Sequence, residues 1–352
     1  MTRTLLPFAP DAATLGRKGR DAMHILITGA AGMIGRKLTD ALVARGTLQG
    51  QPITGLTLVD IVAPVLPDGV PGAAIAADLS DPAAANALIE ARPDVIFHLA
   101  AIVSGEAEAD LHKGYAVNLH GTISLCDAIT REEDYCPRLV FTSSIAVFGA
   151  PLPEVIPDDQ PTLPLTSYGT QKAMGELMIS DLSRRGFMDG ISLRLPTICI
   201  RPGKPNAAAS GFYSSILREP LAGQEAVLPV PDTTRHWFAS PRAAVGFLLH
   251  AAELDLAQLG QDRALSLPGV NATVADEIAA LERIAGPAAT ALIRREPDET
   301  IAGIVAGWPE AFDPARARAL GFKAEPDMDT IIRAHIEDEL GGHITIKERG
   351  AD

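Results

Sequence analysis

Three residues of this chain could together remove a proton from an alcohol: Ser144, Tyr168 and Lys172. A tyrosine phenol has a pKa of ~10 and is a poor base at neutral pH unless a nearby cation stabilises its phenolate. Tyr168 and Lys172 are four residues apart, so on a helix they share a face and can point into one cleft. Ser144 ends a predicted strand and can hydrogen-bond the substrate oxygen. A Tyr-x-x-x-Lys pair alone also occurs on solvated helices, but the ordered set predicts an oxidoreductase.

A glycine-rich turn near the beginning of the chain predicts a dinucleotide site. Gly29, Gly32 and Gly35 follow an apolar run and precede a helical pattern. In a dinucleotide-binding fold, such glycines allow a tight turn, a close approach of backbone to pyrophosphate, and close packing of helix on strand. The spacing is GxxGxxG rather than GxGxxG, so its position between strand and helix carries the interpretation. The cofactor contacts predicted from this turn are Gly29, Gly32, Met33, Ile34 and Gly35.

An acidic residue, Asp60, ends the second predicted strand and indicates which cofactor binds. A carboxylate there can accept both ribose hydroxyls and would repel the extra phosphate of NADP, which favours NAD. Asp60 lies 31 residues beyond Gly29, and the loop 46–55 accommodates the long spacing. It could instead be an ordinary strand-end acid. Asp78 and Leu79 could contact adenine, although Asp78 could also cap a helix.

Alternating strand-like and helix-like segments predict the fold class. Apolar strand candidates occur at 25–28, 56–60, 73–78, 95–99, 139–143 and 191–195. This rhythm predicts an α/β fold with a Rossmann-type doubly wound parallel sheet. Prolines interrupt the rhythm after Leu195, where a smaller, discontinuous C-terminal substrate-binding lobe is expected to begin. The expected bounds are 23–200 and about 235–256 for the NAD-binding domain, with a helix over 243–252, and about 201–234 and 257–342 for the lobe.

Composition and charge exclude several classes of protein. The 352 residues include 30 basic and 44 acidic side chains, and the net charge of −14 would repel nucleic acid and anionic membranes. No apolar run is long enough to span a membrane. The three cysteines show no pairing or metal spacing, so we expect a cytoplasmic protein without a metal. Residues 1–22 lack a secretory signal and are expected to be a disordered leader or an over-long start, and 343–352 an unpacked tail.

The ordered motifs resemble those of the extended short-chain dehydrogenases/reductases over about residues 23–255. They are Thr28-Gly29-x-x-Gly32-x-x-Gly35, His98-Leu99-Ala100-Ala101, Asn118 in Val-Asn-Leu-His-Gly-Thr, Thr142-Ser143-Ser144 and Tyr168-x-x-x-Lys172. The resemblance implies NAD as cofactor, Tyr168 as proton acceptor, Lys172 as its modulator and ribose ligand, and Ser144 as donor to the substrate oxygen. It places Leu99, Ala100, Ala101 and Pro196 beside the cofactor. Asn118 would buttress the helix behind the site, or simply satisfy buried backbone groups. Homodimers are common in this family.

The second half of the chain narrows the expected substrate. Sugar-nucleotide epimerases carry Arg-Asp-Phe/Tyr-Ile-His-Val-x-Asp where this chain has residues 235–242, without that His and final Asp. Dehydratases of the family carry Thr-Asp-Glu where this chain has Thr142-Ser143-Ser144. Segments 196–206, 210–212, 217–221 and 237–242 resemble instead the group that oxidises D-erythronate. This implies NAD-dependent oxidation of the C2 hydroxyl of that four-carbon sugar acid. An NAD-dependent sugar-nucleotide epimerase, an L-threonine dehydrogenase-like enzyme and a dinucleotide sensor remain alternatives.

A sugar acid needs a cation for its carboxylate and polar groups for its hydroxyls. Arg235 is the first choice for the carboxylate, because its family position lies near the cleft. Arg201, Arg218 and Arg242 could equally be solvated or structural, and His236 is expected to be packed rather than catalytic. The predicted substrate contacts are Ser104, Ser144, Tyr168, Thr197, Asn206, Ser210 and Arg235.

Overall fold

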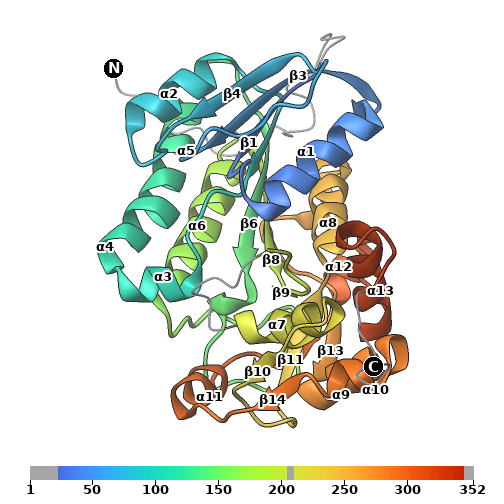
Figure 1. Cartoon of the computed structure of the whole chain (residues 1–352). Coiled ribbons are helices and arrows are strands. Elements are labelled where there is room, and N and C mark those ends of the chain that lie inside the picture. Colours follow the sequence, from blue (N-terminus) through green and yellow to red (C-terminus); the bar gives the residue numbers. More distant parts are fainter. Residues whose placement is uncertain (1–22, 204–209, 345–352) are drawn as a thin grey trace.

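A large parallel sheet forms the frame of the molecule (Figure 1), in a computed structural model that describes residues 23–203 and 210–344. The strand order is β4–β3–β1–β5–β6–β8–β12, and each neighbouring pair is parallel. The strands are β1 (Met23–Thr28), β3 (Gln51–Asp60), β4 (Gly72–Ala76), β5 (Val95–His98), β6 (Arg138–Ser144), β8 (Asp189–Leu195) and β12 (Ala264–Ser266), with β2 (Thr47–Leu48) antiparallel to β3. The predicted doubly wound α/β sheet is confirmed.

Helices cover both faces of this sheet, because successive side chains of a strand point to opposite sides. Ile25 and Ile27 of β1 pack in the core beneath α1 (Met33–Arg45) and α8 (Pro241–Glu253), whereas Leu26 packs under the opposite layer. That opposite layer contains α2 (Pro82–Glu90), α5 (Gly121–Arg131) and α6 (Ser167–Arg184). Figure 1 shows these three helices on the left of the sheet and α1 and α8 on the right. The helix predicted over 243–252 therefore does return to the first domain.

A smaller lobe has its own apolar core. Ile216, Leu281 and Ile332 meet there from three different helices. The lobe elements are β9 (Thr197–Ile198), α7 (Gly211–Leu221), β10 (Ala226–Leu228), β11 (Arg235–Ala239), β13 (Val270–Thr273), α9 (Val274–Ala285), α10 (Pro287–Thr290), β14 (Ile293–Arg295), α11 (Glu299–Val305) and α13 (Met328–Glu339). The other elements are α3 (Ser104–Ala109), α4 (Leu111–Gly114), η2 (Tyr115–His120), η3 (Ile145–Val147), β7 (Ile156–Pro157), η4 (Leu256–Leu259), β15 (Phe312–Asp313) and α12 (Ala315–Ala319).

Two strands fall on the other side of the expected domain boundary. β11, expected at the return to the first domain, pairs instead with β13 and β9 in the lobe. β12, expected in the lobe, extends the large sheet beside β8. Both strands are short, so their sequences show little of the apolar pattern that would predict where they lie. Their pairing is decided by partner strands that are distant in the chain.

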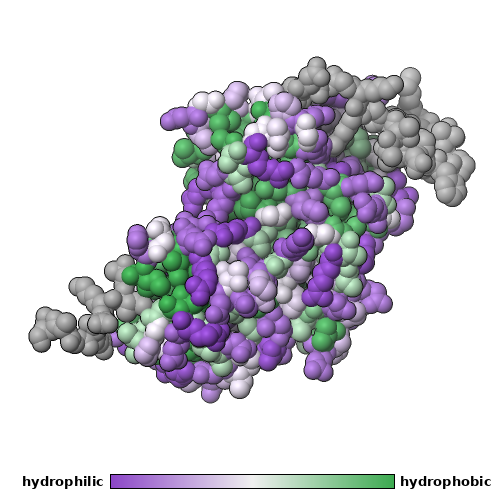
Figure 2. Space-filling view, turned by 90° about the vertical axis from the view of Figure 1, so that its right-hand side faces the viewer, coloured by the Kyte–Doolittle hydropathy of each residue, from purple (hydrophilic) through white to green (hydrophobic). Residues whose placement is uncertain are grey.

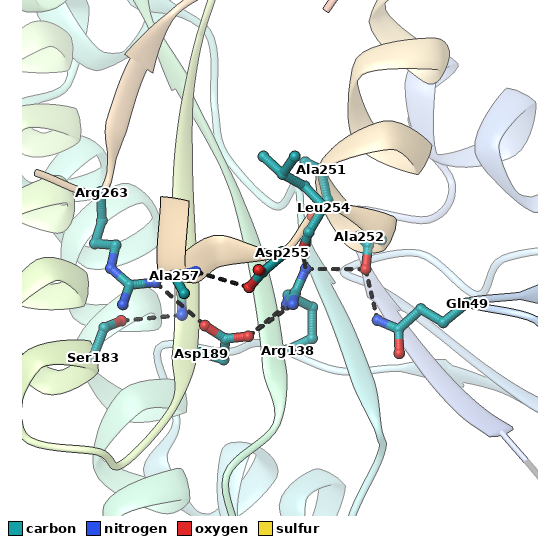
Figure 3. A network of polar contacts seen from close by, with 11 residues as sticks. Gln49, Arg138, Ser183, Asp189, Ala251, Ala252, Leu254, Asp255, Ala257 and Arg263 are labelled. Carbon is teal, nitrogen blue, oxygen red and sulfur yellow. Dashed lines mark hydrogen bonds and ion pairs between the residues drawn. The ribbon is translucent and has the colours of Figure 1, made fainter. Parts of the chain in front are cut away.

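A buried arginine on β6 joins this strand to β8 and to the end of α8 (Figure 3). Arg138 donates to the carbonyls of Ala251, Ala252 and Leu254 at the end of α8, over 2.8–3.0 Å, and pairs with Asp189 at 2.7 Å. A cation at the C-terminal carbonyls of a helix is favourable. Asp189 also pairs with Arg263, directly before β12, at 3.2 Å. The network thus links β6, β8, α8 and the segment that leads into β12.

Polar side chains cover most of the face shown in Figure 2, with smaller apolar patches between them. In the parts of the chain that the structure describes, no helix is both long and apolar enough to cross a membrane. The predicted leader 1–22, the predicted contact Asn206 and all but the first two residues of the predicted tail 343–352 lie outside the described residues.

Candidate active site

A cleft with a volume of about 1550 Å³ lies between the large sheet and the lobe, and we call it the central cleft. Ser144, Tyr168 and Lys172 line it from the first domain, and Thr197 and His236 line it from the lobe. The three predicted catalytic side chains therefore share one cavity. Other predicted residues on its walls are Met33, Ile34, Leu99, Ala101, Ser104, Pro196 and Ser210.

A second pocket, of about 390 Å³, adjoins the central cleft and is lined by Gly29, Gly32 and Gly35. Gly29 has a φ of +73°, and a Cβ there would lie 2.7 Å from the backbone nitrogen of Ala100. At Gly35 a Cβ would overlap the carbonyl oxygen of Gly29. Glycine is therefore required for the turn and for the packing of α1 against it. We call this the glycine-loop pocket.

The N-terminus of α1 opens into the glycine-loop pocket. Its N-cap residue, Gly32, offers no side chain to cap the first turn, so the N–H groups there are available to an anion. Backbone N–H groups, a helix dipole and glycines that permit close approach are what a dinucleotide pyrophosphate needs. The residues present therefore fit such a cofactor.

The predicted ribose and adenine residues lie outside the walls of both cavities, within the described chain. The carboxylate of Asp60 accepts hydrogen bonds from the backbone N–H groups of Ala31, at 3.0 Å, and Ile61, at 2.7 Å. It is thus fixed against the glycine loop. Asp78 accepts from the backbone and hydroxyl of Ser80, and the helix that follows is capped by Asp81 instead. The ribose and adenine contacts remain predictions.

Burial controls the ionisation of both catalytic candidates on α6. It raises the pKa of Tyr168, and a hydrogen bond with Ser144 and the positive charge of Arg201 act to lower that pKa. Burial lowers the pKa of Lys172 to about 7, opposed by the negative charge of Glu176. The Lys172 ammonium donates to the Thr142 carbonyl at 2.8 Å and lies 5.7 Å from the centre of the Tyr168 ring.

A buried ion pair supports the lysine from behind. Glu176, one turn after Lys172 on α6, accepts two hydrogen bonds from Nε of Arg194, at 3.0 and 3.2 Å, and one from Nη2 at 2.8 Å. It also accepts from the Ser143 hydroxyl at 2.5 Å. Neither Glu176 nor Arg194 was among the predicted site residues, although the i, i+4 spacing of Lys172 and Glu176 was a usable signal.

Asn118 lies on the π-helical turn η2 and fixes the start of the loop beside the cleft. Its side-chain oxygen accepts from the N–H of Ile102 at 2.8 Å, and its amide donates to the side chain of Gln171 at 2.8 Å. The buried Asn118 thus satisfies a backbone group of Ile102. Because Gln171 precedes Lys172, the same contact also holds α6.

His236 enters the central cleft as a neutral side chain. Burial lowers its pKa to about 4. Its Nε2 lies 2.6 Å from the hydroxyl of Thr197, and its ring stacks on Tyr213 with the ring centres 5.2 Å apart. The histidine is therefore packed, as expected, and it positions the Thr197 hydroxyl.

The expectation for Arg235 is wrong in its geometry. Arg235 is exposed, is hydrogen-bonded to the side chain of Asn271, and is not among the residues that line either cavity. Neighbouring residues of a strand point to opposite faces, so on β11 it is His236 that faces the cleft. Arg201, left open by the sequence, lines both cavities instead.

Comparison with known proteins places most of the chain in one family. Residues 25–253 match the model of the NAD dependent epimerase/dehydratase family. The chain is 48% identical to the D-erythronate dehydrogenase of Cupriavidus necator over 320 residues, which are 90% of this chain and 98% of that protein. It is 43% identical to the D-erythronate dehydrogenase of Haemophilus influenzae over 90% of this chain and all of that protein.

Solved structures agree on the fold. A crystal structure described as the nucleoside-diphosphate-sugar epimerase of Agrobacterium tumefaciens is 62% identical, with a TM-score of 0.89 over 91% of this chain and 95% of that one. The L-threonine 3-dehydrogenase of Trypanosoma brucei is 23% identical, with a TM-score of 0.79 over 92% and 99% of the two chains, and shows a likeness of fold alone.

Proposed function

This chain belongs to the NAD dependent epimerase/dehydratase family, and within it we propose that the protein oxidises the C2 hydroxyl of D-erythronate to 2-dehydro-D-erythronate in the cytoplasm. It is an NAD-dependent oxidoreductase, as the predicted resemblance to the extended short-chain dehydrogenases/reductases requires. The observation that carries the proposal is the meeting of Ser144, Tyr168 and Lys172 in one cleft beside the glycine loop. The two D-erythronate dehydrogenases that match nearly end to end support the choice of substrate.

In the proposed reaction, the alcohol loses one hydride and one proton and becomes a ketone. NAD, when bound, supplies the acceptor for the hydride from C2. Ser144 holds the hydroxyl oxygen, and the phenolate oxygen of Tyr168 takes the hydroxyl proton and later releases it to solvent. Lys172, in its charged form, favours the phenolate by its positive charge. Glu176 supports this role, because its negative charge raises the pKa of Lys172.

The substrate proposal is tested by following NADH formation with purified protein, NAD and a panel of substrates. The panel contains D-erythronate, L-threonate, D-threonate, L-threonine and UDP-sugars. We expect rapid NADH formation with D-erythronate and at least ~10-fold slower formation with each other compound, since a misplaced hydroxyl leaves buried polar groups of the site unpaired. Equal or faster oxidation of another acid would keep the reaction type and reject the substrate.

A nucleotide-sugar epimerase is the second candidate, favoured by the description of the 62% identical solved structure. Such an enzyme would return the hydride to its substrate, so it would convert a UDP-sugar without net NADH. The replacement of the epimerase motif at 235–242 weighs against it. Sugar analysis after incubation with each UDP-sugar separates the two candidates: an epimerised sugar without NADH would reject the dehydrogenase.

A further inference from the structure

We propose that Arg201 binds the carboxylate of the hydroxy-acid substrate through its guanidinium. The inference rests on the proposed function, because only an acidic substrate offers a carboxylate at this place. It replaces Arg235, which lies outside the described walls of the cleft, as the residue that selects an acid over a neutral sugar.

Arg201 lies at the junction of the two cavities. It follows β9 by three residues, in the lobe wall of the cleft, and it lines both the central cleft and the glycine-loop pocket. It is the only arginine on the described wall of the central cleft. An anion that enters next to Tyr168 therefore meets this guanidinium.

The guanidinium is held in place but retains unused donors. Its Nε donates to the Ile198 carbonyl at 3.1 Å, and its Nη2 donates to the Ser210 hydroxyl at 2.5 Å. Among the described residues, Nη1 has no hydrogen-bond partner and no carboxylate lies within ion-pair distance of the group. Arg201 is half-buried, and its partial removal from water lowers the pKa of the guanidinium. Charges that are partly removed from water in proteins are ordinarily paired, so a ligand carboxylate can supply the missing partner.

The other basic residues described near the cleft are either already hydrogen-bonded or neutral. Lys172 donates to a main-chain carbonyl behind Tyr168. Arg218 lines only the glycine-loop pocket, pairs with Glu219 at 2.5 Å, and donates to the Arg201 carbonyl at 2.6 Å. His236 is neutral, since burial lowers its pKa to about 4. Arg201 is thus the described cation best able to receive a new carboxylate.

The chemistry of the substrate requires a cation at this place. In a 2-hydroxy acid the carboxylate carbon is bonded directly to the carbon that carries the reacting hydroxyl. When that hydroxyl reaches Tyr168, the carboxylate must lie beside the phenol. Arg201 is close enough to Tyr168 for its positive charge to lower the pKa of the phenol. The same guanidinium can therefore orient the acid and present its hydroxyl to the base.

The pyrophosphate of the cofactor is the rival anion, because Arg201 also lines the glycine-loop pocket. The two ligands can be separated by binding measurements in which no turnover occurs. D-erythronate is titrated calorimetrically into the enzyme–NADH complex, and NADH is titrated into the free enzyme. The proteins are the wild type, Arg201→Met, Arg201→Lys, and the control Arg235→Met, which removes the exposed arginine of β11.

We expect Arg201→Met to raise the Kd of D-erythronate at least ~10-fold, as the loss of a charge-assisted pair implies, with the Kd of NADH changed less than ~3-fold. For Arg201→Lys, the Kd of D-erythronate should lie between those of the wild type and Arg201→Met, because lysine keeps the charge but lacks the planar guanidinium. Arg235→Met should bind both ligands like the wild type.

Unchanged binding of D-erythronate by a folded Arg201→Met would overturn the inference while leaving the proposed function intact. A larger loss of NADH binding than of acid binding would assign Arg201 to the pyrophosphate. Absence of NADH formation from D-erythronate and NAD by the wild type would reject the proposed function, and the Arg201 assignment with it. If the methionine variant does not fold, the comparison of Arg201→Lys with the wild type decides the outcome.

Discussion

The ammonium of Lys172 donates a 2.8 Å hydrogen bond to the main-chain carbonyl of Thr142, two residues before Ser144 on β6. This contact fixes helix α6 against the strand that supplies the serine. The base, its cation and the serine are therefore held in register by the fold itself. In this position Lys172 is buried. The burial of its charge determines how the site responds to substitution and to pH.

Removal of the phenol should stop turnover without loss of cofactor binding. We expect Tyr168→Phe to lower kcat at least ~100-fold, as is typical for loss of a general base, while the Kd of NAD changes little. Steady-state NADH formation and a NAD titration measure the two effects. Tyr115→Phe is a matched control, since Tyr115 is half-buried on η2 and is not among the residues lining the described cavities. Near wild-type turnover of Tyr168→Phe would remove Tyr168 from the mechanism.

Lys172 should lower stability at neutral and acidic pH. Its pKa is about 7 in the folded protein and ~10.4 in an unfolded chain, so unfolding takes up a proton between these values. The loss of folding stability caused by the buried charge of Lys172 is therefore largest below pH 7, and it disappears as the pH rises toward ~10.4. We expect Lys172→Met to abolish activity yet to raise the free energy of unfolding, by on the order of 2–4 kcal/mol at pH 6 and by less at pH 9.

Urea unfolding of the cofactor-free protein at both pH values measures this difference. The wild type should gain stability from pH 6 to pH 9 relative to the variant. A constant gap between the two proteins at both pH values would show that Lys172 stays protonated in the folded state throughout this range.

The Glu176–Arg194 pair should be essential to stability. Both side chains are buried, with 5% and 9% of their surfaces exposed. Glu176→Gln leaves the Arg194 charge buried without its partner, and we expect a loss of ~3–5 kcal/mol in the free energy of unfolding. Replacement of both residues, by Gln and Met, should recover part of the loss. The control Glu132→Gln breaks an ion pair with Arg92 that is about 30% exposed, and should cost less than ~1 kcal/mol.

A Glu176 variant also tests the electrostatics of the site. Loss of its negative charge removes the influence that raises the pKa of Lys172. The charged form of Lys172 should then be lost at lower pH, so we expect kcat to begin its alkaline decline at lower pH than in the wild type. If the pH profile of kcat keeps its position, the role of Glu176 is structural only.

Local patterns were sufficient to predict several elements of the first domain and the shared helix face of Tyr168 and Lys172. The apolar run 25–28 and the helical pattern 243–252 appear as β1 and α8. Both were predictable because the spacing of apolar residues within a short segment indicates its secondary structure. The Tyr168–Lys172 spacing is equally local, since a helix fixes which face both residues share. The glycine turn is confirmed as a close approach of backbones at Gly29.

Features that depend on long-range pairing could not be predicted in this way. Arg235 was placed in the cleft on family position, but the pairing of β11 with β13 turns it outward. Arg194 on β8 pairs with Glu176 on α6, 18 positions earlier in the chain, and nothing in either local sequence indicates this partner. The exposed or buried state of Arg201 likewise depends on how the lobe closes over the first domain.

The glycine turn provides the last prediction. At Gly29, a Cβ would lie 2.7 Å from the Ala100 nitrogen and the φ of +73° disfavours any side chain, so Gly29→Ala must displace the glycine turn from the segment that follows β5. We expect the Kd of NAD to rise at least ~10-fold, because the backbone can no longer approach the pyrophosphate closely. Gly246→Ala is the matched control: this glycine lies within α8 with open space around its Cβ position, and the change should stabilise by ~0.5–1 kcal/mol without altering NAD binding. Calorimetric NAD titration and thermal unfolding of both variants separate a local effect on the cofactor site from a general loss of stability. Unchanged NAD affinity in a folded Gly29→Ala variant would show that the cofactor does not use this turn.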